Sequence, residues 1–404
     1  MDGVRKKKIL YGKGREASKF IYNYECKHGR RSFREDFIFV LDNNSREGEQ
    51  YRHLNCYKLE KAPDMRGCFI VIAIAGVDNY LTIKRLLEKR GYIEYSDFIY
   101  YTLYEKKQVV INANCHGGIL IKYLMNSGSF REQYGIYPMK EIHFNDAGIS
   151  EDVLKNTDLY IHQRIKNDNK YGYQYSDERC LRLLNKKARD FCIPNLWPLG
   201  GKGFFPTQIM EGNDEVRYDT ELLFYRDLLI DEAYNSVNNP TLEHVCNYIQ
   251  TYEYDCKEIK NNFNKALQKI KADEQHWDIK ISDYIEANYK RIPMFIDVGH
   301  PSFELMQYMC IEICKNLGFN DIEDVNTDAM FPLDYQIGYE VFMWPQVKKI
   351  LGIEYSDEPV RLNRGTVLNY INPVPCCLLG MTNKEYIREY IYMFWDDLLP
   401  DRLT

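Results

Sequence analysis

The sequence predicts an α/β protein whose sheets are largely parallel. Short runs rich in Val, Ile and Leu alternate with segments whose apolar residues recur at helical spacing, which is typical of strand–helix–strand units. The run at 68–75 is apolar throughout, as expected of a strand buried on both faces of a parallel sheet. Several strands end in polar residues, and ligands of open parallel sheets gather at those ends. We therefore expect a site at a sheet edge.

Composition narrows the class of protein further. A chain of 404 residues with 45% hydrophobic residues can bury more than one core. No apolar run reaches the roughly 18 residues of a membrane helix, and no apolar signal region follows the N-terminal lysines. We therefore expect a cytoplasmic protein without an integral membrane segment. The net charge of −6 argues against a nucleic-acid partner. The twelve cysteines include no Cys-x-x-Cys pair, so we expect reduced thiols and no metal.

The first hundred residues predict a small strand–helix–strand domain, which we assign to residues 1–104. Strands are expected at 8–11, 37–41 and 68–75. The first strand leads into a helix that extends to about Tyr24. The helix after the third strand ends at Gly91, and its apolar residues are Leu81, Ile83, Leu86 and Leu87.

A glycine-rich turn follows the first strand of this domain. Its pattern, Gly12-x-Gly14-x-x-Ala17, fits a phosphate-binding turn, in which glycines allow a tight turn and a close approach of the backbone to a phosphate. Asp42 follows the second strand, where an acidic residue can bind a ribose hydroxyl. The turn predicts a nucleotide or nucleotide-sugar site. The alternative is a nucleotide fold retained only as a scaffold.

Residues 6–103 resemble the N-terminal Rossmann-like domain of bacterial sugar-modifying enzymes, such as sugar N-acetyltransferases. The resemblance rests on Ile-Leu-Tyr-Gly-Lys-Gly at 9–14, Val-Leu-Asp-Asn-Asn at 40–44 and Ile-Val-Ile-Ala-Ile-Ala at 70–75. It implies a domain that can bind a nucleotide-sugar.

The second predicted domain, residues 105–404, begins with a cysteine at a strand–helix turn. The β-branched run at 109–111 ends at Asn114-Cys115-His116-Gly117-Gly118, and a helical pattern follows from Ile119. A thiol here lies near unpaired backbone N–H groups and the positive end of a helix, which favours the thiolate. The N–H groups of Cys115–Gly117 could also hold an oxyanion. The alternative is a buried structural cysteine.

Later strands are expected at 142–144, 158–163 and 189–195, and each ends in polar residues. Because the carboxyl ends of parallel strands share one edge, we expect one group of polar side chains there. This group comprises Asn114, Cys115, His162, Gln163 and Asn195. The stretch 197–208 is interpreted as a loop, and the pattern at 220–290 predicts a helical insertion.

A second set of candidate catalytic residues follows this insertion. The sequence at 292–302 predicts a strand that delivers Asp297 and His300, with a helix at 303–317 behind it. The spacing allows the carboxylate to orient the imidazole, as in a nucleophile–base–orienter arrangement. The alternative is a histidine that only caps a helix or packs.

Cys115 together with Asp297-x-x-His300 resembles the site of SGNH-type esterases. Those enzymes have Asp-Ser after the first strand and an Asp-x-x-His block near the end. Here Asn114-Cys115 stands in place of Asp-Ser, so the nucleophile would be a thiol. Their Gly and Gly-x-Asn-Asp blocks are not recognisable in this sequence. The resemblance implies an SGNH-like α/β fold for the second domain.

Residues 108–370 are similar to the WcbI family of capsular polysaccharide biosynthesis enzymes, which are regarded as acetyltransferases that bind coenzyme A. Ala113 replaces a family Gly, and His116 replaces a family Gln. The matching segments are Asn-Ala-Asn-Cys-His at 112–116, Leu-Tyr-Ile-His-Gln at 159–163, Ile-Pro-Asn at 193–195 and Phe-Ile-Asp-Val-Gly-His-Pro at 295–301.

The WcbI resemblance implies transfer of an acyl group, acetyl in the first instance, from coenzyme A to a sugar in capsular or exopolysaccharide biosynthesis. His300, oriented by Asp297, would deprotonate Cys115 or an acceptor hydroxyl, and Cys115 would carry the acyl group or only line the site. Residues expected to bind the oxyanion or the substrate are Asn114, His116, Gly117, His162, Gln163 and Asn195. Candidates for the phosphates of coenzyme A are Arg164 and Lys202.

Two other functions remain open for this sequence. One is a sugar-ester hydrolase that uses the same three residues with water as the acceptor. The other is a non-catalytic protein that binds a nucleotide-sugar through residues 6–103. The expected partner in every case is a small molecule or a saccharide, and the oligomeric state is left open.

Overall fold

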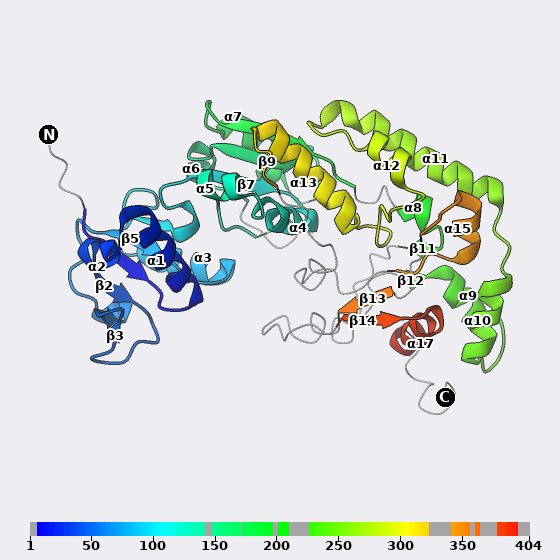
Figure 1. The fold of residues 1–404 in the computed structure, drawn as a ribbon, viewed down its shortest axis with the longest axis horizontal. Helices are drawn as coiled ribbons and strands as arrows, with labels where there is room; N and C mark the ends of the chain where they lie inside the picture. The colour runs from blue at the N-terminus through cyan, green and yellow to red at the C-terminus, as the bar shows by residue number, and fades with distance from the viewer. Residues whose placement is uncertain are drawn as a thin grey trace. The chain divides into compact units, whose positions relative to one another are not determined.

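The computed structural model describes residues 6–140, 142, 148–170, 172–196, 201–209, 226–322, 341–355, 360–363 and 378–394. The chain forms two compact units, which are described separately (Figure 1). The first unit comprises Met1–Asn112, Glu132–Ile161 and Lys166–Asp190. The second comprises Ala113–Arg131, His162–Ile165 and Phe191–Thr404. The boundary expected between residues 104 and 105 does not coincide with the limits of these units, and it stays a prediction.

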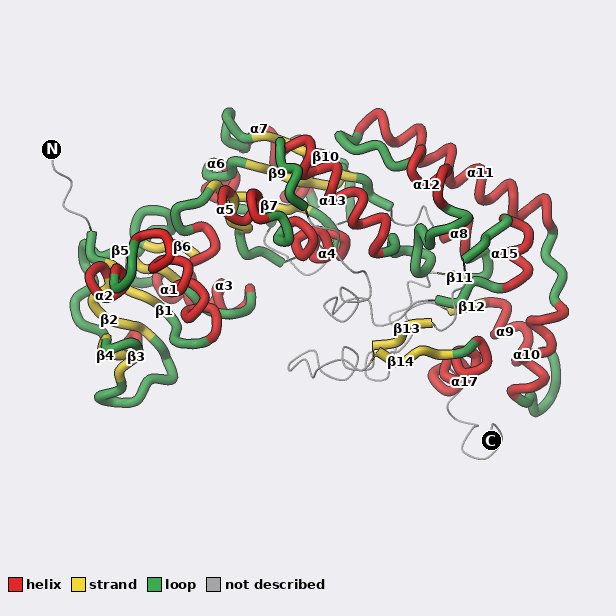
Figure 2. Tube along the Cα trace, in the orientation of Figure 1, coloured by secondary structure: helices red, strands yellow, loops and turns green. Residues whose placement is uncertain are grey.

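A six-stranded sheet forms the N-terminal part of the first unit (Figure 2). The strand order is β3-β4-β2-β1-β5-β6, and every neighbouring pair is parallel except β3 with β4. The strands are β1 Lys8–Tyr11, β2 Phe37–Leu41, β3 Gln50–Tyr51, β4 Leu54–Tyr57, β5 Phe69–Ile72 and β6 Phe98–Tyr100. The helices are α1 Arg15–His28, α2 Ser32–Asp36 and α3 Val77–Glu88.

Helices cover both faces of this sheet. Alternate residues of each strand point to opposite faces, so each face can pack against a different helix. Leu10, Val40 and Val71 pack with α1 in one buried cluster. Ile9, Phe39 and Ile70 pack with Tyr80, Ile83 and Leu87 of α3 in another. The predicted α/β class and the parallel pairing of the central strands are therefore confirmed.

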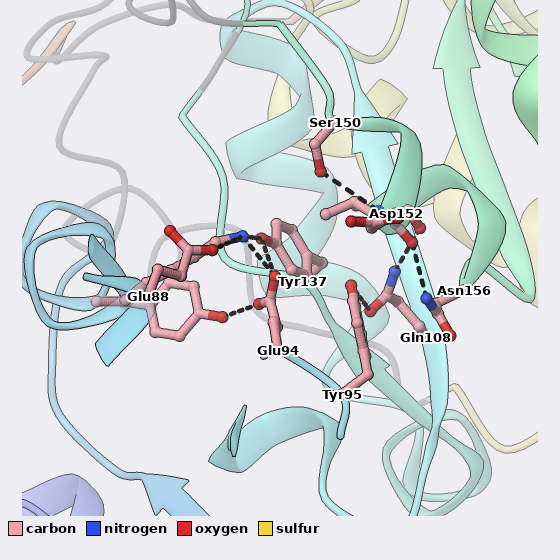
Figure 3. Close-up of polar contacts among 11 residues, drawn as sticks. Glu88, Glu94, Tyr95, Gln108, Tyr137, Ser150, Asp152 and Asn156 are labelled. Carbon is pink, nitrogen blue, oxygen red and sulfur yellow. Dashed lines mark hydrogen bonds and ion pairs between the residues drawn. The ribbon is translucent and has the colours of Figure 1, made fainter. Parts of the chain in front are cut away.

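A polar network holds α3 against later segments of the first unit (Figure 3). The buried Glu94 carboxylate accepts hydrogen bonds from Tyr80 and Lys84, and from the Tyr137 hydroxyl at 3.4 Å. The Tyr95 hydroxyl donates to Gln108 Oε1 at 2.9 Å. Since three donors compensate the buried carboxylate, this network is a structural tie.

A four-stranded sheet with the order β10-β9-β7-β8 follows along the chain. Its strands are β7 Lys107–Asn112, β8 Tyr134–Ile136, β9 Leu159–Gln163 and β10 Arg189–Ile193. The helices between them are α4 Cys115–Leu124, α5 Gly128–Gln133, α6 Glu151–Lys155 and α7 Asp177–Leu183. The last residues of β9 and β10 belong to the second unit, together with α4.

Helices dominate the rest of the second unit. They are α8 Gly201–Phe204, α9 Leu228–Asn235, α10 Leu242–Thr251, α11 Cys256–Asp273, α12 Ser282–Asn288, α13 Phe303–Leu317, α15 Pro345–Leu351 and α17 Asn383–Phe394. Two antiparallel strand pairs accompany them, β11 Gln208–Ile209 with β12 Arg226–Asp227, and β13 Val360–Asn363 with β14 Leu378–Met381. Within the described ranges, no helix combines the length and the apolar character needed to span a bilayer.

Most predicted elements are present, and their ends show where local patterns mislead. The strands at 8–11 and 37–41 and the helix at 303–317 agree residue for residue with β1, β2 and α13. The strand expected at 68–75 stops at Ile72, because the chain then turns toward α3, whose N-cap is Gly76. Of the strand expected at 142–144, only Ile142 lies among the described residues.

The strand expected at 292–302 is wrong. This segment is a compact loop closed by one bridge between Phe295 and Pro301. The apolar run of this segment predicts a strand. Instead, the Asp297 side chain accepts hydrogen bonds from the N–H groups of Gly299 and His300, which bends the chain.

Candidate active site

The turn after β7 presents Cys115 as the first residue of α4. Asn114 is the N-cap: its side-chain Oδ1 accepts the His116 N–H at 3.0 Å, and its carbonyl accepts the Gly117 N–H at 2.8 Å. The helix therefore begins four residues before Ile119, where the apolar pattern starts. The half-buried Cys115 thiol lies at the positive end of this helix.

The loop closed by Phe295 and Pro301 carries the other two candidate catalytic residues. Asp297 is buried, and its Oδ1 accepts the N–H groups of Gly299 at 2.6 Å and of His300 at 2.7 Å. The same carboxylate lies 2.8 Å from His300 Nδ1 through Oδ2. The imidazole ring is thus fixed by the turn that precedes it.

Cys115 and His300 meet although 185 positions separate them in the sequence. The distance from Cys115 Sγ to His300 Nε2 is 3.4 Å. Because Nδ1 donates to Asp297, Nε2 is the nitrogen available to the sulfur. The three side chains form a continuous Cys–His–Asp row, which is the geometry of a nucleophile, a base and an orienting carboxylate.

The electrostatics of this row favour an imidazolium. Burial lowers the pKa of the His300 imidazole, whereas the Asp297 carboxylate and the Cys115 sulfur raise it. The net effect holds the pKa of His300 well above its ordinary value. A protonated His300 places a positive charge beside the Cys115 sulfur.

Two of the predicted backbone donors for an oxyanion are already engaged. The N–H groups of His116 and Gly117 both donate to Asn114. The N–H of Cys115 itself has no partner within the described part of the chain. Of the three N–H groups expected to bind an oxyanion, the Cys115 N–H is therefore the one that remains available among the described residues.

Among the side chains expected at the sheet edge, Gln163 contacts both the backbone of Asn114 and the His116 side chain. Gln163 Oε1 accepts the Asn114 N–H at 3.0 Å, and Gln163 Nε2 lies 3.3 Å from His116 Nδ1. Both side chains are buried. His162 is also buried, with Nδ1 3.3 Å from the Gln163 carbonyl. Asn195 follows Pro194, whose carbonyl accepts from Gln163 Nε2 at 3.3 Å.

Sequence reasoning missed Gln208. Its Oε1 accepts the Val298 N–H at 3.1 Å, next to Asp297. The residue lies in β11, inside the stretch interpreted as a loop, and a single glutamine there carries no signal in the sequence. The loop is held from another side by Val341, whose N–H donates to the Ile296 carbonyl at 2.8 Å.

The family model described as polysaccharide biosynthesis enzyme WcbI matches residues 108–321, which is more than half of the sequence. The chain belongs to the WcbI family. The WcbI match includes Cys115, Gln163, Asp297 and His300.

A solved structure supports the WcbI fold. It is reported as WcbI, a novel polysaccharide biosynthesis enzyme, in its native form without a disulfide bond between coenzyme A and a cysteine of that protein. It is 15% identical to this chain, with a TM-score of 0.51, and the match covers 72% of this chain and 90% of that one. A search of curated proteins gave no match.

Arg164 and Lys202, the candidate cations for the phosphates of coenzyme A, are described to different extents. Arg164 is exposed and directly follows β9. Lys202 lies in α8, and its side chain is outside the described part. Among the described residues, no group of three or more His, Cys, Asp or Glu side chains could hold a metal ion.

The turn after β1, which lies outside the WcbI match, fits part of the phosphate-binding pattern. Gly12 has φ +113°, and a Cβ there would lie 2.5 Å from the Ala73 carbonyl oxygen, so only glycine fits. Gly14 is the N-cap of α1 and has open space around it. Ala17 is a buried residue of α1.

The charges beside the β1 turn are paired with each other. Lys13 Nζ lies 2.7 Å from Glu49 and 4.0 Å from Asp42. Asp42 Oδ1 also accepts the Asn44 N–H at 2.9 Å. Nucleotide binding at this turn stays a prediction.

Proposed function

We propose that this WcbI-family protein transfers an acyl group, most simply acetyl, from a coenzyme A thioester to a sugar used in capsular or exopolysaccharide biosynthesis. The observation that carries the proposal is the 3.4 Å approach of Cys115 Sγ to His300 Nε2, with Asp297 on the far side of the imidazole. The coenzyme A named with the related WcbI structure supports the choice of donor. The order of the Asn-Cys turn and the Asp-x-x-His loop supports an SGNH-like domain.

The first step is formation of an acyl-enzyme. The Cys115 thiolate attacks the thioester carbonyl, so a new sulfur–carbon bond forms and the carbonyl oxygen becomes an oxyanion. The free N–H of Cys115 is a donor for this oxyanion, and one such donor typically contributes about 3 kcal/mol. The tetrahedral intermediate collapses with loss of the coenzyme A sulfur, which takes a proton from His300.

The second step regenerates the enzyme. The neutral His300 takes the proton of an acceptor hydroxyl, and the resulting alkoxide attacks the acyl carbon on Cys115. The ester forms, the carbon–sulfur bond breaks, and Cys115 returns to a thiolate beside a protonated His300. In the variant mechanism, His300 activates the acceptor for direct attack on the thioester, and Cys115 only lines the site.

The remaining groups would serve binding. Arg164 and Lys202 are the candidate cations for the phosphates of coenzyme A, and Asn195 is a candidate contact for the sugar. The turn with Gly12, Gly14 and Ala17, together with Asp42, would hold a nucleotide-linked acceptor. We expect the reaction in the cytoplasm, where coenzyme A thioesters are made.

The test follows the acyl group. Radiolabelled acetyl-CoA is incubated with the full chain, alone and with a panel of nucleotide-sugars and capsular oligosaccharides. We expect a labelled protein without acceptor and a labelled sugar with the right acceptor. Hydrolysis of the thioester at the same rate with and without every sugar would overturn the transferase and favour the hydrolase. No turnover and no binding of acetyl-CoA would also overturn the transferase.

A further inference from the structure

A chain of hydrogen bonds runs from the end of β9 through α4 to the loop that carries His300. It begins at Gln163, whose Oε1 accepts the Asn114 N–H at 3.0 Å. This contact fixes the orientation of the amide, because a backbone N–H requires an oxygen. Gln163 Nε2 is therefore the donor, and it lies 3.3 Å from both His116 Nδ1 and the Pro194 carbonyl.

The next link is the His116 imidazole. Since Nδ1 accepts from Gln163, the ring proton is on Nε2, which lies 3.3 Å from the Gly299 carbonyl and donates to it. The His116 side chain is completely buried, and its ring centroid lies 6.1 Å from that of His300. It can touch neither coenzyme A nor a sugar, so its role must be exercised through other residues.

The Gly299–His300 peptide is held at both of its polar groups. Its carbonyl accepts from His116 Nε2, and its N–H donates to Asp297 Oδ1 at 2.7 Å. Fixing both ends of one peptide plane fixes the direction in which the His300 side chain leaves the backbone. That direction brings His300 Nε2 to 3.4 Å from Cys115 Sγ.

We propose that His116 and Gln163 are positioning residues, which hold the Gly299–His300 peptide so that His300 faces the Cys115 sulfur. This replaces the substrate contacts expected for these two side chains from the sequence. The inference rests on the proposed function only in taking the Cys115–His300 pair to act in catalysis. The pairing of Cys115 with His300 can be measured without any turnover.

The first test observes His116 in the unmodified protein. Long-range ¹H–¹⁵N spectra of the full chain with ¹⁵N-labelled histidine distinguish the two neutral tautomers. Loss of one set of signals in His116→Gln assigns the ring. We expect the Nε2–H tautomer at neutral pH. A ring protonated at Nδ1 would overturn the proposal, since it could not accept from Gln163.

The second test follows the rate of Cys115 alkylation by iodoacetamide against pH, read by mass spectrometry of the Cys115 peptide. Only the thiolate reacts, so the profile reports the pairing with His300. In His116→Leu the anchor on Gly299 is lost. We expect the rate at pH 6.5 to fall about tenfold, as a shift of the profile by about one pH unit requires.

Conservative and unrelated variants complete this test. Glutamine offers both a donor and an acceptor, so His116→Gln should keep the wild-type profile within about twofold if hydrogen bonding is what matters. His244→Leu removes a histidine far along the chain that pairs with Ser236, and it should change nothing. Should His116→Leu fail to fold, Gln163→Leu, which removes the donor to Nδ1 without adding a charge, must shift the profile instead.

The outcomes separate the two hypotheses. A His116→Leu profile identical to wild type, while His300→Ala shifts the profile, overturns the positioning role and leaves the proposed function intact. An unchanged profile in His300→Ala means that Cys115 is not paired with His300, which overturns both the positioning role and the acyl-enzyme mechanism of the proposed function.

Discussion

The turns after β1 and after β7 offer a comparison within one chain. Each connects a buried strand to a helix of ten or more residues, and each was expected to be a site. At the first turn, α1 begins at a glycine without a side-chain cap, and the nearby Lys13 is paired with Glu49. At the second, Asn114 caps α4 and the Cys115 sulfur meets an imidazole from a distant loop.

The difference teaches what a strand–turn–helix unit can and cannot supply. Both turns supply backbone N–H groups at a helix N-terminus, which suit an anion. Only the second receives a titratable partner that is buried and itself oriented by a carboxylate. The feature that sets the β7 turn apart, an imidazole held against its sulfur, therefore comes from the segment at 295–301, and not from the turn alone.

The largest expected effect is the loss of Cys115. Cys115→Ala should lower the rate of acetyl transfer by at least about 10³-fold, since removing the nucleophile from such a row disables the whole unit. The measurement is radiolabel transfer from acetyl-CoA, with Cys68→Ala, a partly buried thiol of the first unit, as the matched control. Full turnover in Cys115→Ala would leave His300 as the direct base.

The next effect concerns the charge beside His300. Asp297→Asn removes the carboxylate that raises the pKa of this imidazole, so the pKa falls and the ring loses its proton at lower pH. In the proposed mechanism protonated His300 serves the leaving coenzyme A sulfur, so the alkaline limb of the rate profile should move to lower pH. The maximal rate should fall about 10²-fold.

The pH profile of single-turnover acyl-enzyme formation checks this prediction. Asp278→Asn, which alters a carboxylate whose Oδ2 accepts the Cys192 N–H, controls for a general effect of losing an aspartate in the second unit. An alkaline limb at the wild-type position in Asp297→Asn would show that Asp297 does not set the protonation of His300.

At the turn after β1, the next expected effect is on the free energy of unfolding. Gly12→Ala places a Cβ 2.5 Å from the Ala73 carbonyl oxygen at φ +113°, so we expect a loss of about 1–3 kcal/mol in the free energy of unfolding. Gly14→Ala meets no atom within 4 Å and should cost about 0.5 kcal/mol as a weaker N-cap. Urea unfolding measures both, and equal losses would contradict the difference.

The smallest expected effect tests whether the first turn binds a nucleotide. Glu49→Gln releases Lys13 from its ion pair and should tighten the binding of UDP-glucose by up to about fivefold, as expected for a partly exposed pair. Calorimetric titration measures the affinity, with Asp64→Asn, which alters an exposed carboxylate paired with Arg66, as the control. No binding to wild type or variant would favour a scaffold role for this domain.

Local patterns in the sequence determined most of the fold. The apolar runs at 8–11 and 37–41 became β1 and β2, and the helical spacing after Ser302 became α13, because strand and helix periodicity are properties of neighbouring residues. The strand–turn–helix around Cys115 was predicted for the same reason. So was the order of Asp297 and His300, which supported the family resemblance.

Only the tertiary structure decided how these parts act together. The bent loop at 295–301 depends on which N–H groups the Asp297 carboxylate reaches, and an apolar run in the sequence does not record this. The approach of His300 to Cys115 spans 185 positions. The hydrogen bonds of His116 with Gly299 and of Gln208 with Val298 join segments that are far apart in the sequence and share no sequence pattern. Hydrogen bonds between distant segments depend on packing of the whole unit, so no local pattern predicts them.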